Sequence, residues 1–173
     1  MPETNVPTTR TQTKFPVKFW MFTSVAAVPA YAAETLNQSV SVGASANVVE
    51  LVGANTRIVD IDPYTKLMDI DQCLAAVNEK TKAVMPVHLY GQMVDMKELR
   101  QRLPSHIKII EDAAHAFGSS YKGKKLGSFG NATCFSFDPI KTLTCGEGGA
   151  IAISDDIIAE NIRIKRILGI DRD

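Results

Sequence analysis

Short apolar runs separated by stretches with helical periodicity are the feature that most limits the fold of this 173-residue chain. The run KAVMPVHLYG (82–91) is almost continuously apolar, as in a strand buried on both faces of a parallel sheet. Further runs have the length and composition of strands: TRIVDID (56–62), IKIIED (107–112), ATCFSF (132–137) and GAIAIS (149–154). This pattern predicts an α/β fold with a mostly parallel sheet.

The segments between these runs carry helix signals. A helix is predicted to end at Gly53, and Asp69 or Asp71 is expected to cap the helix that follows. VDMKELRQRL (94–103) is amphipathic, and DDIIAENIRIKRIL (155–168) begins a last helix. We therefore expect crossover helices between successive strands. In open sheets of this kind, ligands bind at the carboxyl ends of the strands.

Charge and cysteine content argue against several functions. The chain has 19 basic and 19 acidic residues and no long charge run, which argues against electrostatic binding of nucleic acid. Cys73, Cys134 and Cys145 are far apart and form neither a C-x-x-C pair nor a zinc spacing. We expect three reduced thiols and no metal site.

The N-terminal residues lack this regularity, and we expect residues 1–44 to form an atypical segment that is partly disordered. Within it, KFPVKFWMFTSVAAVPAYAAE (14–34) loosely resembles a secretory signal. It starts only after a polar lead, and Pro29 follows its apolar part, so we interpret the likeness as accidental and expect a cytoplasmic protein. The stretch is also too short and too interrupted for a membrane-spanning helix.

Asp112 and His115 follow one of the predicted buried strands. Asp112 ends the run 107–112 and precedes two alanines, and a partly desolvated carboxylate at such a place needs a cationic partner. The alternative role for Asp112 is to cap the next segment. His115 is expected near Asp112 if the turn is helical, or it is a structural histidine.

Lys141 lies after the next strand, with Ser136 before it and Thr142 and Thr144 behind it. A lysine among small polar groups can lose its proton and bond to an aldehyde, although a lone lysine is more often a solvated loop residue. Pyridoxal phosphate needs such a lysine, a carboxylate for its ring nitrogen, and hydroxyl and backbone donors for its phosphate. The strand ends offer all three kinds of group. The glycines of CGEGGA (145–150) lead into a strand and match no nucleotide-binding loop, so they predict a tight turn.

Two long stretches resemble a known family. PVHLYGQMVDM (86–96) and IIEDAAHAFGSSYKGKKLGSFGNATCFSFDPIKTLTCGEGGAIAISDD (109–156) resemble the DegT/DnrJ-type sugar aminotransferases. These are pyridoxal-phosphate enzymes of the aspartate aminotransferase type, fold type I. The resemblance covers about residues 45–173 and implies a three-layer α/β/α large domain. We expect this domain to be incomplete, and the small C-terminal domain to be absent, because the chain stops at LGIDRD (168–173).

The resemblance also assigns roles to single residues. It implies that Lys141 bonds to the cofactor aldehyde and moves the proton during transamination. Asp112 is the implied partner of the ring nitrogen, His115 stands near the ring, and Ser136 contacts the phosphate. The implied reaction transfers an amino group, usually from glutamate, to a nucleotide-linked keto-sugar. A homodimer with its active sites at the subunit interface is also implied, with no nucleic-acid or membrane partner.

Two departures from the family pattern leave alternatives open. In FTSVAAVPA (22–30), Val25 stands where a phosphate-binding turn would have glycine, and Val42 stands where an aromatic side chain would stack on the ring. One alternative is a truncated, inactive remnant of such an enzyme. A weaker one is a related pyridoxamine-phosphate-dependent sugar dehydratase, a class that typically carries histidine in place of Lys141.

Overall fold

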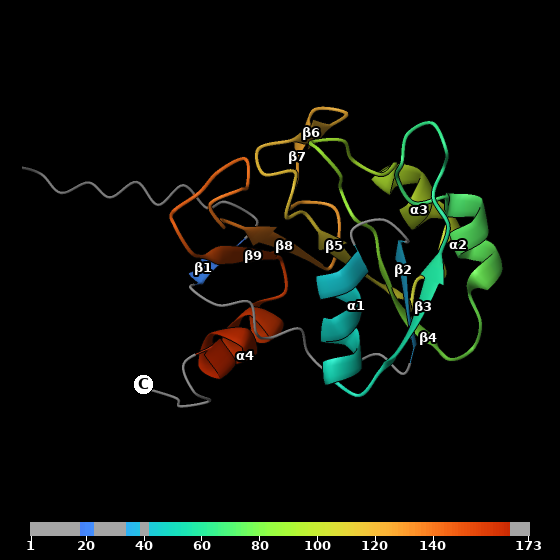
Figure 1. Ribbon diagram of the computed structural model, residues 1–173. Helices are drawn as coiled ribbons and strands as arrows, with labels where there is room; N and C mark the ends of the chain where they lie inside the picture. Colours follow the sequence, from blue (N-terminus) through green and yellow to red (C-terminus); the bar gives the residue numbers. More distant parts are fainter. Residues whose placement is uncertain (1–17, 23–33, 39–41, 167–173) are drawn as a thin grey trace, which may run out of the picture.

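Seven strands form one sheet in the computed structural model, which describes residues 18–22, 34–38 and 42–166 (Figure 1). Their order is β1-β9-β8-β5-β4-β2-β3. The strands are β1 (Lys18–Phe22), β2 (Glu34–Gln38), β3 (Asn55–Val59), β4 (Thr81–Met85), β5 (Lys108–Asp112), β8 (Ala132–Ser136) and β9 (Gly149–Ile153). From β8 to β3 all neighbours are parallel, whereas β9 is antiparallel to both β8 and β1. The predicted mostly parallel α/β sheet is confirmed.

Four helices in the described ranges flank this sheet (Figure 1). They are α1 (Val42–Leu51), α2 (Ile70–Ala76), α3 (Met96–Arg102) and α4 (Asp156–Arg166). Successive residues of a strand point to opposite faces, so neighbours in β4 join different cores. Met85 packs with Val49 of α1, whereas Val84 packs in the core that contains α2 and α3. Since Ile151 of β9 packs with α4 on the same face as Met85, the layers are α1 with α4, the sheet, and α2 with α3.

The helix boundaries follow the signals in the sequence. Gly53 has φ +76°, the left-handed conformation that closes α1 and that glycine adopts without strain. Asp69 caps α2, because its side chain accepts a hydrogen bond from the backbone N–H of Gln72. Both predictions are confirmed.

The predicted strand 82–91 is wrong in its second half. β4 ends at Met85, because the next residue, Pro86, has no N–H to donate to a ladder. Beyond it, only an isolated bridge joins Val87 to Asp112. The rest of the run, HLYG (88–91), forms a loop at the carboxyl end of β4.

The segment YKGKKLGSFGN (121–131) forms surface turns. A small hairpin of β6 (Ser120–Tyr121) and β7 (Lys124–Lys125) opens it, and its lysines are exposed. The tight turn before β9 is also present, since Gly146 has φ +85°.

Residues before position 45 contribute β1, β2 and the start of α1. The sequence did not indicate the two strands. β2 lies inside the sheet, between β4 and β3. The predicted disordered tail, Val25 and the side chain of Val42 lie outside the described part of the chain. None of the described helices is long and apolar enough to cross a membrane.

Candidate active site

A pocket of about 330 Å³ opens at the carboxyl ends of β4, β5 and β8, on the face that α1 covers. This is the edge at which parallel α/β sheets bind ligands. Its wall is formed mainly by small and apolar residues, with Ser45, Asp112, Ser136 and Lys141 as polar groups. The lining residues are Ala44, Ser45, Val48, Met85, Ile110, Glu111, Asp112, Ala114, Cys134, Phe135, Ser136 and Lys141. Three of the four predicted site residues thus share one pocket.

Asp112 is the last residue of β5, and two donors hold its carboxylate. Ser45 of α1 donates its hydroxyl to Oδ2 over 2.5 Å, and the backbone N–H of Ala114 donates to Oδ1 over 3.0 Å. The Ala114 contact is a turn of the kind that aspartate makes with the backbone two residues on. The contact with Ala114 agrees with the capping alternative, and pairing with a cationic group stays a prediction. The carboxylate is oriented and still lines the pocket.

Lys141 and His115 meet across the loops that follow β8 and β5. The Nζ atom of Lys141 lies 3.0 Å from Nε2 of His115. Both side chains are half-buried, so Lys141 is not the solvated loop lysine of the alternative interpretation. With Lys141 protonated, Nε2 accepts this hydrogen bond and the imidazole proton is on Nδ1. That Nδ1 atom is buried and has no partner among the described residues.

Tyr90 packs against His115 in a stacked arrangement. The ring centroids are 5.6 Å apart and the planes meet at 23°. Tyr90 has φ +51°, and the next residue, Gly91, donates its N–H to the carbonyl of His115 over 2.9 Å. A non-glycine residue in this conformation costs free energy, so the surrounding loop must fix it. The loop after β4 thus contacts His115 through a ring stack and a backbone hydrogen bond.

Ser136 ends β8 and stands at the start of the loop that carries Lys141. Its Oγ accepts a 3.4 Å contact from the backbone N–H of Asp138, which leaves the hydroxyl proton free for another acceptor. Thr144 donates its hydroxyl to the carbonyl of Phe137, and the N–H of Cys145 bonds to the same carbonyl. The loop thus closes on itself and returns the chain to β9.

Cys73, Cys134 and Cys145 form no disulfide with one another in the structure. Burial raises the pKa of Cys134, which lines the pocket, to about 12, and the nearby carboxylates add to the shift. Burial also raises the pKa of Cys73 to about 12. Both thiols are therefore protonated near neutral pH, which removes them as nucleophiles. The described residues contain no cluster of metal-ligating side chains.

The residues present fit pyridoxal phosphate. A lysine amine, a carboxylate and a free hydroxyl converge on one pocket with small, apolar walls. The buried Nδ1 atom of His115 adds a polar group that still lacks a partner among the described residues.

Ser45 and Tyr90 belong to this arrangement, and sequence reasoning missed both. Ser45 lies 67 positions from Asp112 within a helix of small residues, where no motif marks it. The only signal for Tyr90 was its place at the end of a run expected to be a strand.

Comparison with known proteins identifies one family over most of the chain. A model described as the DegT/DnrJ/EryC1/StrS aminotransferase family matches residues 25–173. GDP-perosamine synthase of Caulobacter vibrioides is 44% identical over 139 residues, which are 80% of this chain and 38% of that protein.

Two solved structures extend the likeness. The sugar aminotransferase CalS13 from Micromonospora echinospora has a TM-score of 0.78 and 33% identity over 83% of this chain and 41% of its own. GDP-4-keto-6-deoxymannose-3-dehydratase, solved with a trapped PLP-glutamate geminal diamine, has a TM-score of 0.76 and 28% identity over 80% of this chain and 36% of its own. The predicted fold, part of the large domain of a fold type I transferase, is confirmed. The chain spans less than half the length of each of these relatives.

Proposed function

The chain belongs to the DegT/DnrJ/EryC1/StrS aminotransferase family, and on this premise we propose that its pocket binds pyridoxal phosphate for amino-group transfer to a nucleotide-linked keto-sugar. The observation that carries the proposal is the convergence of Lys141 and Asp112 on one pocket at the carboxyl ends of β5 and β8. The amino donor in this proposal is glutamate, and the protein works as a homodimer.

Each polar side chain of the pocket has a task in this proposal. Asp112, oriented by Ser45 and Ala114, pairs with the protonated ring nitrogen. When bound, pyridoxal phosphate supplies an electron sink that stabilises negative charge at the substrate carbon. Lys141 attaches the cofactor through its Nζ atom and later carries a proton on that atom, with Nε2 of His115 as its hydrogen-bond partner. Ser136 donates its hydroxyl to the phosphate.

The sugar substrate, the amino donor and the homodimer are argued from three further observations. The name of the Caulobacter relative contains a nucleotide-linked sugar, and glutamate is bound with PLP in the dehydratase structure. Ile140 and Leu143 flank Lys141 and are 86% and 46% exposed. Apolar side chains on both sides of a site residue suit a surface that a second subunit covers.

Cofactor attachment is tested by adding pyridoxal phosphate to the purified chain and reducing the product with borohydride. Before reduction, we expect the visible absorbance of a lysine-bound cofactor. After reduction, peptide mass spectrometry should place the added mass on Lys141. Lys141→Ala should abolish both signals. Lys124→Ala, which removes an exposed lysine of the β6–β7 hairpin, should change neither. Attachment spread over surface lysines would contradict the proposal.

The reaction is tested with glutamate and the loaded protein. An aminotransferase releases 2-oxoglutarate in an amount equal to the bound cofactor, because the amino group moves from glutamate to the cofactor. An inactive remnant releases none. A sugar dehydratase removes a hydroxyl group from a nucleotide-linked sugar without leaving nitrogen on it. Lys141 favours the aminotransferase, because the dehydratases typically carry histidine there.

A further inference from the structure

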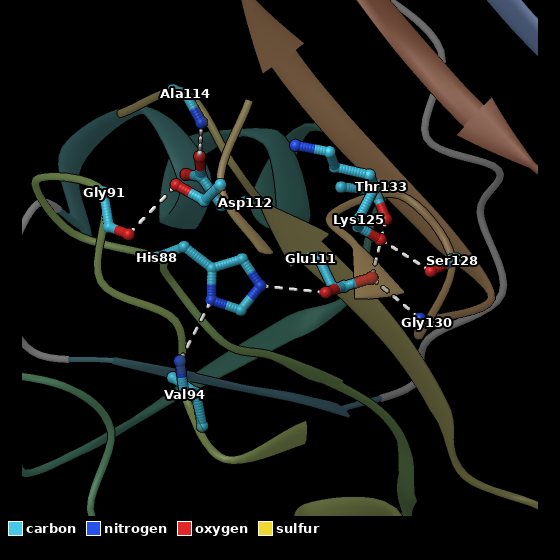
Figure 2. Close-up of polar contacts among 11 residues, drawn as sticks. His88, Gly91, Val94, Glu111, Asp112, Ala114, Lys125, Ser128, Gly130 and Thr133 are labelled. Atoms are coloured by element: carbon cyan, nitrogen blue, oxygen red, sulfur yellow. Dashed lines mark hydrogen bonds and ion pairs between the residues drawn. The ribbon is translucent and has the colours of Figure 1, made fainter. Parts of the chain in front are cut away.

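A second polar cluster lies behind the pocket, on the opposite face of the sheet. Asp112 and Glu111 are consecutive in β5, so their side chains leave the strand on different faces. Glu111, His88 and Thr133 are each no more than 1% exposed. Figure 2 shows the carboxylate of Asp112 turned toward Ala114 and that of Glu111 turned toward Gly130 and Thr133. We call Glu111, His88 and Thr133 the buried cluster.

Three short hydrogen bonds hold the Glu111 carboxylate. Oε1 accepts from the Thr133 hydroxyl over 2.6 Å and from the Gly130 N–H over 2.7 Å. Oε2 lies 2.8 Å from Nε2 of His88. Because the N–H of Val94 points at Nδ1 of His88, that nitrogen is the acceptor and Nε2 carries the proton that it donates to Glu111. The buried charge is therefore held by three donors that fix its orientation.

Two backbone hydrogen bonds beside the buried cluster fasten Asp112 to the segment after β4. His88 donates its backbone N–H to the Asp112 carbonyl, and Asp112 donates its own N–H to the Pro86 carbonyl, both over 2.9 Å. Thr133 lies in β8, whose register with β5 places Glu111 opposite Thr133 and Asp112 opposite Cys134. Through Glu111, the cluster thus ties the segment after β4 to β5 and β8 next to Asp112.

A gain in the stability of the fold does not by itself explain why polar side chains occupy this buried position. Removing a carboxylate from water is costly even when hydrogen bonds replace those of water, and apolar side chains of similar shape avoid that cost. The site is also built tightly, because a Cβ atom on Gly130 would lie 2.7 Å from Oε1 of Glu111. Fixed orientation of the neighbouring residue is what the cluster adds.

We propose that Glu111 is a positioning residue, which Thr133 and His88 hold so that the Asp112 carboxylate keeps the angle at which it meets the ring nitrogen of the cofactor. This inference rests on the proposed function for its cofactor and on the hydrogen bonds above for its geometry. The residue that touches the cofactor is Asp112, and Glu111 acts through the backbone of β5.

The first test needs no cofactor. The Ala114 N–H donates to Oδ1 of Asp112, so its hydrogen exchange reports the orientation of that carboxylate. Thr133→Val removes the donated hydroxyl and keeps the side-chain shape. We expect Thr133→Val to speed Ala114 exchange about tenfold, and Thr133→Ser, which keeps the hydroxyl, to restore slow exchange. Thr81→Val is the matched control, because Thr81 is equally buried but lies at the amino end of β4.

The second test measures cofactor affinity in the full chain. Thr133→Val should weaken binding of pyridoxal phosphate about tenfold, since partners that orient a binding group have effects of that order. The same variant should leave unchanged the affinity for an analogue with a C–H group in place of the ring nitrogen, because Asp112 has no ring proton to meet there. Thr81→Val should leave both affinities unchanged.

Three outcomes would overturn the inference. One is Ala114 exchange that is equally fast in Thr133→Ser and Thr133→Val. The second is equal loss of affinity for the cofactor and its analogue, which indicates general loosening. The third is the same exchange change in Thr81→Val. If wild-type protein attaches no cofactor to Lys141, the proposed function fails, while the exchange measurement still decides whether the buried cluster holds Asp112.

Discussion

The two faces of β5 at its carboxyl end differ in how their carboxylates are satisfied. On the α2–α3 face, Glu111 is fully enclosed and takes three hydrogen bonds from protein groups. On the α1 face, Asp112 is half-buried, takes two hydrogen bonds and lines an open pocket. Consecutive residues of the same charge thus occupy unlike environments.

This difference separates a group that is fixed from a group that is available. A carboxylate whose oxygens already accept hydrogen bonds from buried protein groups has little remaining capacity to bind a ligand. Removing one of these donors lowers the stability of the fold. A carboxylate that is oriented but open to a pocket can bind a cation while costing the fold little. We therefore expect substitutions on the Glu111 face to cost more stability than substitutions on the Asp112 face, whereas both faces can affect cofactor binding through Asp112.

The largest effect should follow from His88→Leu. The change removes the donor to Oε2 of Glu111 and leaves a buried carboxylate partly unpaired. We expect the free energy of unfolding to fall by about 3–5 kcal/mol, measured by urea denaturation. Asp71→Ala breaks an ion pair with Arg102 whose side chains are 80% and 44% exposed, and should cost at most about 1 kcal/mol. Equal losses in the two variants would remove the distinction between the enclosed and the exposed pair.

Gly130→Ala should have the next largest effect. The new Cβ atom would lie 2.7 Å from Oε1 of Glu111 and 3.0 Å from the carbonyl oxygen of Ile109, so a hydrogen bond or a strand must shift. We expect a loss of about 1–3 kcal/mol in the free energy of unfolding. Gly43→Ala, in α1 with no atom within 4 Å of the added Cβ, should instead stabilise the chain by about 0.5–1 kcal/mol. A loss of the same size at both glycines would mean that close packing at Gly130 is not the cause.

Most of the predicted strands share one property, an apolar sequence. β4, β5, β8 and β9 lie inside the sheet and are recognisable in the sequence as apolar runs. β2 has the sequence ETLNQ, which is mostly polar and has no apolar period, although it lies between β4 and β3. Its place depends on pairing with strands far along the chain, and local composition carries no signal for that.

In the site, too, residues that a local sequence pattern marks were predicted, and residues brought together by strand pairing were not. Asp112 and Lys141 were predicted because each follows an apolar strand, and the carboxyl ends of parallel strands meet at one edge. His115 was predicted near Asp112 and the cofactor ring, and in the structure its side chain contacts Lys141. His88 and Glu111 lie inside or at the end of predicted strands, and their pairing depends on strand register, which the sequence does not state.

The smallest effect on stability should come from Ser45→Ala, on the pocket face. The change removes one of the two donors to Asp112. Because that carboxylate borders a pocket that water can enter, we expect a loss of only about 1 kcal/mol in the free energy of unfolding. The affinity for pyridoxal phosphate should fall more clearly, about tenfold, since the freed carboxylate turns away from the ring nitrogen. Urea denaturation and cofactor titration measure the two quantities on the same protein.

Ser45→Thr provides the matched variant, because it keeps the donating hydroxyl while adding a methyl group at a position that is 8% exposed. It should keep the affinity that Ser45→Ala loses. Loss of affinity in both variants would indicate that the shape of α1, and not the hydrogen bond, is what matters. A loss of stability in Ser45→Ala as large as that in His88→Leu would show that the two faces of β5 contribute equally to the stability of the fold. Together, the His88 and Ser45 substitutions separate the enclosed carboxylate from the one that borders the pocket, because only His88→Leu is expected to cost as much as about 3–5 kcal/mol of stability.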